Sequence, residues 1–369
     1  MKSKGFLKTL ITVILLLALT GTVLTACGTS APASETGDQT AQKTDTDAAA
    51  ASTPVENNGE TIKMVSYFGA PHPYYEDVKV GVAAFEKDYG IPVEKKIGPD
   101  FQQQSETENM EALAAKGVKY FSVYPSDPTA ANGLFEELTK KGVKIVNFGA
   151  STVLPTTASF CVATDVKAAA MAATEFVIKQ MGEKGNILNT LEVLSDANTR
   201  LRKEGVEEAV KKYPNVKIIQ EVSDMKSSEE AIQKIGDAFA ANGDKIDGII
   251  ATGNTTSVGV AQVIADYKSK GGTRVIHSIG IDTDPILMKS ISDGNMEATI
   301  AQNTNAHGYI SCLLLKYLSE GWTPREGQYF VDSGYVIVTK DNIDSYSADL
   351  DKVTQDIKAS IETKYVEKK

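Results

Sequence analysis

Short apolar segments alternate with amphipathic helical segments from residue 61 onward, and this alternation restricts the fold more than any other feature. Strands are predicted at residues 62–68, 119–124, 143–148, 159–163, 186–191, 216–222, 246–251, 275–279, 297–301 and 330–338. Helices are predicted at residues 75–89, 129–141, 166–181, 200–213, 227–241, 257–269, 284–293, 305–320 and 346–365. Strands that alternate with helices of about 10 to 15 residues are typical of βαβ units, so the chain is predicted to be α/β with parallel sheets.

Composition removes several functional classes. The 369 residues carry 38 Lys and Arg against 48 Asp and Glu, and an acidic chain is poorly suited to nucleic acid, which is held by basic clusters. Three Cys and three His, no two of the His close in sequence, do not form a disulfide scaffold or a common zinc motif. The G-x-G-x-x-G, G-x-x-x-x-G-K-[ST], G-x-S-x-G and H-E-x-x-H signatures are absent from the sequence. We expect neither catalysis nor a metal or organic cofactor.

The first 60 residues are predicted to be a leader and a tether. Lys2, Lys4 and Lys8 precede an apolar run at residues 10–19, as in a secretory signal over residues 1–26. Leu24-Thr25-Ala26-Cys27 resembles a bacterial lipobox, which implies that Cys27 is acylated and anchors the protein to the cell membrane; the alternative is an ordinary signal with a chance Cys. Residues 27–60 are rich in Ala, Ser, Thr, Asp and Gln, which predicts a disordered tether.

Polar and aromatic clusters follow five of the predicted strands, at residues 69–75, 124–127, 195–202, 253–256 and 280–284. In open α/β sheets, ligands bind beyond the carboxyl ends of the strands. The repeated position of these clusters therefore predicts a ligand site built from several loops.

Residues 280–302 carry a family resemblance. They contain the turn Gly280-Ile281-Asp282, a helix, Asp293-Gly294, and a strand that ends in Ala301-Gln302. This order resembles the type I periplasmic sugar-binding proteins, the ribose-binding-protein family, over about residues 61–340. The resemblance implies two doubly wound parallel-sheet lobes joined by three crossover strands, near residues 164–165, 302–304 and 332–333. It places residues 61–164 and 303–332 in the N-terminal lobe, and residues 165–302 and 333–369 in the C-terminal lobe.

The resemblance also implies which residues bind the solute. Tyr74 and Tyr75 match a pair of ring-stacking aromatics, His72 replaces an amide, and Tyr124 closes the second strand. The remaining positions that carry over are Arg202, Met225, Asn254, Asp282 and Gln302, of which Met225 falls where the family has a third aromatic ring. Gly149-Ala150 replaces the family's Asp-Arg pair, which grips ring oxygens. We therefore expect a polyol, a deoxy sugar or another small neutral solute rather than ribose, glucose or galactose.

Each of these residues also has a structural interpretation. Tyr74 and Tyr75 suit the core of the first helix, Arg202 suits a solvated helix start, and Asp282 suits the N-cap of the helix near residue 284. Gln302 suits the hydrogen bonding of crossover backbone. Together at strand ends, however, planar charged groups and aromatic rings match the hydroxyls and C–H faces of a neutral sugar or polyol.

The sequence thus predicts an extracytoplasmic, lipid-anchored and monomeric solute receptor of an ABC importer, which closes its two lobes on a sugar or polyol and delivers it to a membrane permease. Alternatives on the same fold are a sensor for a histidine kinase or chemoreceptor, and a nucleoside- or autoinducer-binding lipoprotein. An extracytoplasmic hydrolase is disfavoured because no nucleophile elbow is present. Whether Cys161 and Cys312 pair stays open.

Overall fold

The computed structural model describes residues 56–57, 60–72 and 74–368. The predicted signal segment, Cys27 and most of the predicted tether lie outside these residues. In the part of the chain that is described, no helix combines the length and the apolar character that crossing a bilayer requires. A two-stranded ribbon, β1 (Glu56–Asn57) with β2 (Glu60–Thr61), precedes the first sheet.

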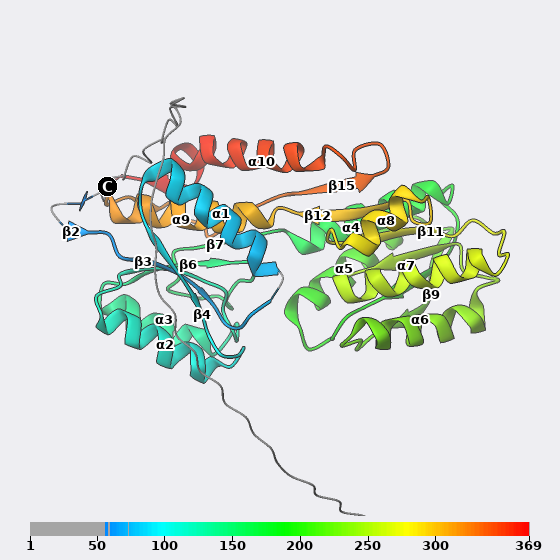
Figure 1. Cartoon of the computed structure of the whole chain (residues 1–369), viewed down its shortest axis with the longest axis horizontal. Helices are drawn as coiled ribbons and strands as arrows, with labels where there is room; N and C mark the ends of the chain where they lie inside the picture. Colours follow the sequence, from blue (N-terminus) through cyan, green and yellow to red (C-terminus); the bar gives the residue numbers. More distant parts are fainter. Residues whose placement is uncertain (1–55, 58–59, 73, 369) are drawn as a thin grey trace, which may run out of the picture. The chain divides into compact units, whose positions relative to one another are not determined.

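The first sheet has six parallel strands in the order β14-β7-β6-β5-β3-β4 (Figure 1). These are β3 (Met64–Phe68), β4 (Val93–Ile97), β5 (Tyr120–Val123), β6 (Lys144–Phe148), β7 (Phe160–Ala163) and β14 (Phe330–Asp332). Helices α1 (Tyr74–Tyr89) and α9 (Thr304–Ser319) pack on one face, and α2 (Gln103–Ala115) and α3 (Ala131–Lys140) on the other. Alternate strand residues divide between the two faces: Met64 joins the α1 and α9 side, while Val65 joins the α2 and α3 side.

The second sheet repeats this arrangement with one exception. Its order is β15-β12-β11-β10-β8-β9, formed by β8 (Gly185–Thr190), β9 (Val216–Val222), β10 (Gly248–Ala251), β11 (His277–Ile281), β12 (Ala298–Gln302) and β15 (Tyr335–Thr339). Helices α4 (Val166–Gln180) and α5 (Ala197–Lys211) cover one face; α6 (Ser228–Asn242), α7 (Asn254–Ser269) and α8 (Pro285–Ser292) cover the other. Strand β15 runs antiparallel to β12, so this doubly wound sheet is parallel except at that edge.

The chain passes between the sheets at three places: between β7 and α4, between β12 and α9, and between β14 and β15. The last passage divides the single strand predicted at residues 330–338. Gly334 adopts a left-handed backbone conformation there, with φ of 75°, and a Cβ at this position would lie 2.7 Å from Val353. The turn therefore requires glycine twice over, for its backbone angle and for the space.

Two elements of the first lobe, strand β4 and helix α2, have no counterpart among the predicted segments. Strand β4 reads Val-Glu-Lys-Lys-Ile, and it pairs with β3 alone at the edge of the sheet. Charged residues are common on edge strands because they discourage pairing with other chains, and they erase the apolar pattern on which the prediction relied. Helix α2 likewise buries few of its side chains, chiefly Met110 and Leu113.

The assignment of residues 333–369 to the C-terminal lobe is wrong beyond β15. Helix α10 (Tyr346–Ser360), the π-helical turn Ile361–Tyr365 and β16 (Val366–Glu367) return to the first lobe, where β16 pairs with β13 (Thr323–Pro324). Ile357, Ile361 and Tyr365 are buried in the same cluster as the apolar residues of α1 and α9. Apolar side chains spaced along this terminal segment therefore complete the N-terminal core. Figure 1 shows the backbone of α10 running back from β15 toward the first lobe.

The cysteines at 161 and 312 are free thiols in this structure. Cys161 lies on β7 and Cys312 on α9, and both are fully buried. Burial raises the pKa of both thiols, to about 12 for Cys312. They therefore serve as small apolar core residues.

The position of the C-terminal segment is testable with Ile361→Ala. Ile361 is fully buried, so the substitution is expected to lower the free energy of unfolding by about 2–5 kcal/mol, measured by urea denaturation. Ile286→Ala, at a position that is 50% exposed on α8, is the matched control and should change stability by less than about 0.5 kcal/mol. Equal, small effects for both variants would remove the segment from the core.

Candidate functional site

A cavity of about 870 Å³ lies where loops from both sheets meet, at the carboxyl ends of several strands. Among the residues that line it are His72, Tyr74, Tyr75, Tyr124, Arg202, Asn254, Asp282 and Gln302. Every predicted site residue except Met225 therefore lines this cavity. The position agrees with the rule that open α/β sheets bind ligands beyond their strand ends.

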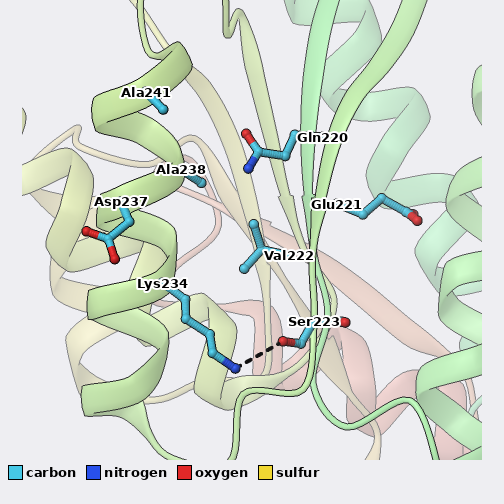
Figure 2. A pocket seen from close by; sticks show the side chains of 8 residues that line it. All are labelled: Gln220, Glu221, Val222, Ser223, Lys234, Asp237, Ala238 and Ala241. Carbon is cyan, nitrogen blue, oxygen red and sulfur yellow. Dashed lines mark hydrogen bonds between the residues drawn. The ribbon is translucent and has the colours of Figure 1, made fainter.

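A second hollow, between the edge strand β9 and α6, offers less chemistry (Figure 2). Lys234 is the basic residue in it, and its ammonium group already pairs with Glu230 at 2.7 Å and donates to the carbonyls of Ser223 and Asp224. Figure 2 shows Glu221 pointing away from α6, and its carboxylate is held by Lys203 and Asn189. Lys234 and Glu221 are thus paired within the protein, so we place the candidate site in the larger cavity.

The first lobe contributes an aromatic wall. Tyr74 and Tyr75 begin α1, Tyr124 follows β5, and Phe101 precedes α2. The ring of Tyr75 lies 5.2 Å from that of Tyr74 and 5.7 Å from that of Tyr124, with interplanar angles of 65° and 74°. Such edge-to-face packing fixes the rings against one another. The core interpretation holds for Tyr75 as well, because it is 2% exposed and packs on Phe68.

His72 lies at the rim of this wall. Its Nδ1 accepts a hydrogen bond from the Tyr74 backbone N–H at 3.2 Å, and its carbonyl accepts one from the Tyr75 N–H at 3.0 Å. His72 thus shapes the loop that starts α1, and its ring is exposed beside the cavity.

The absence of a side chain at Gly149 is required by the positions of the Tyr74 hydroxyl and the Tyr124 ring in this chain. Gly149 has a φ of 71°, and a Cβ added to it would lie 2.4 Å from the Tyr74 Oη and 3.0 Å from the Tyr124 ring. No side chain fits here while both tyrosines keep their places. The rings of Tyr74 and Tyr124 therefore replace the directional grip that the sequence resemblance leads one to expect at this loop.

The second lobe contributes the charged groups. Arg202, on α5, is 8% exposed and makes no hydrogen bond or ion pair with any residue that the structure describes. Its neighbour Arg200 is exposed and donates to the carbonyls of Leu194 and Ser195. The solvated-charge interpretation thus fits Arg200 and not Arg202. A buried guanidinium without a protein partner is suited to donate to a solute oxygen.

Asp282 is held in a strained conformation that aims it at the cavity. Its φ is 72°, its carbonyl accepts from the Thr299 hydroxyl at 2.7 Å, and its Oδ1 accepts from the Gln302 amide at 2.7 Å. The N-cap of α8 is Asp284, which accepts from the Ile286 N–H at 2.8 Å. Asp282 is therefore not a capping residue, and its second carboxylate oxygen is available beside Gln302.

Sequence reasoning missed several residues that line the cavity, among them Glu192 and His307. Glu192 Oε1 accepts from the Thr255 N–H at 2.9 Å, and a Cβ at Gly253 would lie 2.2 Å from its carboxyl carbon, so glycine is what admits this side chain. Burial raises the pKa of Glu192, while the Thr255 hydrogen bond and the Arg202 charge lower it. Its place directly after β8 is the signal that the strand-end rule offered.

His307 had no comparable signal. It lies on α9, a helix with apolar residues on most of its surface, and its side chain is 2% exposed. Burial lowers the pKa of His307 to about 3, so the imidazole is neutral at physiological pH.

Met225 does not belong to the site. It is 1% exposed and packs in the core between the second sheet and α6 and α7, with Leu188, Ile235 and Ile249 in the same cluster. The preceding residue, Asp224, has a φ of 59°, and its N–H donates to the Glu192 carbonyl. The expected third ring-stacking position is therefore a core position, and apolar burial explains the methionine.

The cavity is acidic. Its lining carboxylates are Asp77, Glu192, Asp196, Asp282 and Asp284, against one guanidinium, so the formal balance is 1 − 5 = −4 with histidine neutral. Asp196 and Asp284 also cap α5 and α8, where the helix dipoles offset part of their charge. Within the described residues, no group of three His, Cys, Asp or Glu is arranged to hold a metal ion. The electrostatics favour a neutral or cationic solute over an anionic one.

Comparisons with known proteins agree with this architecture. Residues 63–322 match the family model described as "Periplasmic binding protein domain". The chain is 23% identical to the xylitol-binding protein of Mycolicibacterium smegmatis over 65% of this chain and 66% of that protein, slightly less than two thirds of its length. It is 26% identical to the D-allose-binding periplasmic protein of Escherichia coli, over 63% of this chain and 76% of that protein.

A solved structure is similar over most of the folded part. The sugar-binding protein of a sugar ABC transporter from Bacillus halodurans superposes with a TM-score of 0.70 at 22% identity, covering 77% of this chain and 99% of that one. This likeness establishes the type I fold of two α/β lobes. Because the family model spans residues 63–322, the chain is a member of the periplasmic binding protein family.

Proposed function

We propose that this protein is the extracytoplasmic, lipid-anchored receptor of an ABC importer, and that it captures a neutral sugar or polyol for a membrane permease. The observation that carries the proposal is the division of the cavity between two sheets, with the Tyr74, Tyr75 and Tyr124 wall on one lobe and Arg202 and Asp282 on the other. A solute that contacts both walls stabilises the closed arrangement, because its contacts are complete only when the lobes approach.

The solute class follows from the two kinds of wall. Hydroxyl groups suit the unpaired Arg202 guanidinium and the Asp282–Gln302 pair, and C–H faces suit the tyrosine rings. The names of the relatives, which refer to xylitol and D-allose, support a polyhydroxylated solute. Gly149 leaves no side chain to clamp a rigid ring, which favours a polyol or a deoxy sugar over ribose, glucose or galactose.

A thermal-shift screen of the chain lacking residues 1–27 tests this proposal. The screen contains polyols, deoxy sugars, aldoses, nucleosides, amino sugars and sugar phosphates. A neutral polyhydroxylated solute at about 100 times its Kd should stabilise the protein by about 2.7 kcal/mol and raise its Tm. Submicromolar binding of ribose, glucose or galactose, with polyols and deoxy sugars at least about a hundredfold weaker, would refute the proposed solute preference.

Arg202→Ala should weaken the binding of the best solute from this screen by about tenfold or more, because it removes charge-assisted hydrogen bonds worth roughly 1.5–3 kcal/mol. Calorimetry measures the affinity, and the Tm of the solute-free protein should change little. Arg200→Ala is the matched control, since Arg200 is exposed two residues away. If Arg202→Ala lowers the solute-free Tm strongly and leaves the affinity unchanged, Arg202 has a structural role.

Gly149→Ala tests the aromatic wall. The added methyl group collides with Tyr74 and Tyr124, so affinity for the same solute should fall by about tenfold or more as the rings move. Gly142→Ala is the control, because Gly142 has a similar φ of 83° but nothing within 4 Å of its Cβ position. Both variants carry the backbone strain, and Gly149→Ala alone adds the collision. Equal affinities for the two variants would show that the position of these rings does not matter.

Cys27→Ala tests the anchor. The variant should no longer incorporate labelled palmitate in cells and should lose its lipid-dependent mobility shift, because the thiol that accepts the lipid is absent. Replacing a buried cysteine, Cys312→Ala, serves as the control and should leave labelling unchanged. Continued labelling of Cys27→Ala would refute the lipobox interpretation.

A further inference from the structure

A buried hydrogen-bonded chain leads from the cavity to the crossing segments. The Tyr74 hydroxyl lies 2.6 Å from His307 Nδ1, and His307 Nε2 lies 2.8 Å from the Ser333 hydroxyl. The Ser333 hydroxyl lies 3.1 Å from that of Thr164. Tyr74 and His307 line the cavity, whereas Thr164 and Ser333 stand where the chain passes between the sheets, after β7 and β14. His307, Ser333 and Thr164 are all at most 3% exposed.

The remaining crossing segment, between β12 and α9, holds the Ser333 end of the hydrogen-bonded chain in place. Asn303, between β12 and α9, donates from Nδ2 to the Ser333 carbonyl at 3.0 Å and to the Thr354 hydroxyl of α10 at 3.0 Å. The Asp332 carboxylate accepts from the backbone N–H groups of Asp165 and Gly334. Residues of all three crossing segments thus form one hydrogen-bonded cluster, and its hydroxyls have few alternative partners.

The imidazole of His307 carries one proton, because burial keeps it neutral. A neutral imidazole has one donor nitrogen and one acceptor nitrogen. If Nδ1 holds the proton, it donates to the Tyr74 oxygen, and the Tyr74 O–H is left to donate to the solute. If Nε2 holds the proton, it donates to Ser333, and Tyr74 must spend its own O–H on Nδ1 and can then only accept from the solute.

The direction in which hydrogen bonds are donated along this series of groups depends on the crossing segments. In the first state Thr164 donates to Ser333, and Ser333 donates to Nε2. In the second state Ser333 donates to Thr164, whose own proton goes to the Gly334 carbonyl. The Thr164–Ser333 contact of 3.1 Å serves in both states, and the Thr164–Gly334 contact of 3.4 Å gives the second state only a weak additional bond, so the observed geometry accommodates both states.

Resting on the proposed function, we propose that His307 is a positioning residue whose tautomer decides whether the Tyr74 hydroxyl donates to a solute oxygen or accepts from a solute hydroxyl, and that the hydroxyls of Ser333 and Thr164 set this tautomer. The hydrogen-bonding specificity of Tyr74 is thereby tied to the conformation of the segments that must bend when the lobes close. In this role His307 contributes no charge to the site and needs no direct contact with the solute. It selects which hydrogen-bonding role Tyr74 plays.

The decisive test reads the tautomer of His307 in the solute-free full chain. Nitrogen-15 NMR of histidine-labelled protein distinguishes Nδ1–H from Nε2–H, and the chain has three histidines to assign. Tyr74→Phe removes the acceptor for an Nδ1 proton and should enrich the Nε2–H form relative to the wild type. Adding Thr164→Val to Tyr74→Phe removes the acceptor that Ser333 then needs, and should shift the tautomer ratio back by about fivefold, the value of one buried hydrogen bond.

Thr164 does not touch the imidazole, so a merely structural role of His307 predicts no response of the ring to Thr164→Val in the Tyr74→Phe background. Thr174→Val, at a buried threonine that bonds within α4, is the matched control and should leave the ratio unchanged. If the Thr164 variant does not fold, Ser333→Ala in the Tyr74→Phe background should give the same reversal. A charged ring at pH 7, or a ratio indifferent to the residue at 164 or 333, would overturn the proposal.

A second readout separates this inference from the proposed function. Calorimetry with xylitol and D-allose on the full chain compares wild type with Ser333→Ala, which removes the relay but touches no solute. If either probe binds, Ser333→Ala should weaken it by about threefold to tenfold, while Thr174→Val should not. If neither probe binds but the predicted tautomer changes are observed, the result counts against these two solutes and supports the link from His307 to Ser333 and Thr164. If xylitol binds but the tautomer ratio does not respond to the substitutions, the result supports the proposed function and refutes the link.

Discussion

The hydrogen-bonded cluster at the crossing segments is the constraint on which the two lobes depend. Asn303, Ser333 and Thr164 come from three separate passages of the chain, yet their side chains and backbone share one buried network. Buried polar groups are costly unless they are bonded, so each passage needs the other two. Helix α10 joins the same network through Thr354 and buries Ile357 and Ile361 against the N-terminal core. The terminal segment is thus part of the framework that carries the site.

The cavity inherits its character from this framework. One wall is aromatic and held by edge-to-face packing, and the other is charged and held by strand ends and helix starts. Close packing couples the aromatic wall to residue 149, because Tyr74 and Tyr124 occupy the space that a side chain at that position would need. Solute preference, on this view, is a property of the loop set rather than of one residue.

Much of the site was predictable because its residues follow a local rule. Arg202, Asn254 and Asp282 stand just beyond strand ends or in the first turns of the next helices, and a parallel sheet brings such positions to one edge. Glu192 obeys the same rule, and was missed because the cluster was started at Ser195. Met225 was misplaced because alignment to a family fixes the position of a residue in the chain but not the direction of its side chain. Here the residue after a left-handed turn at Asp224 packs into the core.

The sequence by itself determined the alternation of strands and helices and the edge at which a solute site must lie, because these follow from apolar periodicity and chain order. Its resemblance to a family implied the two α/β lobes. Only the tertiary structure decided that the terminal segment returns to the first lobe, that β15 runs antiparallel, and that His307 connects Tyr74 to Ser333. These features join residues far apart in the chain: Tyr74 and His307 are 233 positions apart. Their partners are chosen by packing in three dimensions, and local composition carries no record of that choice.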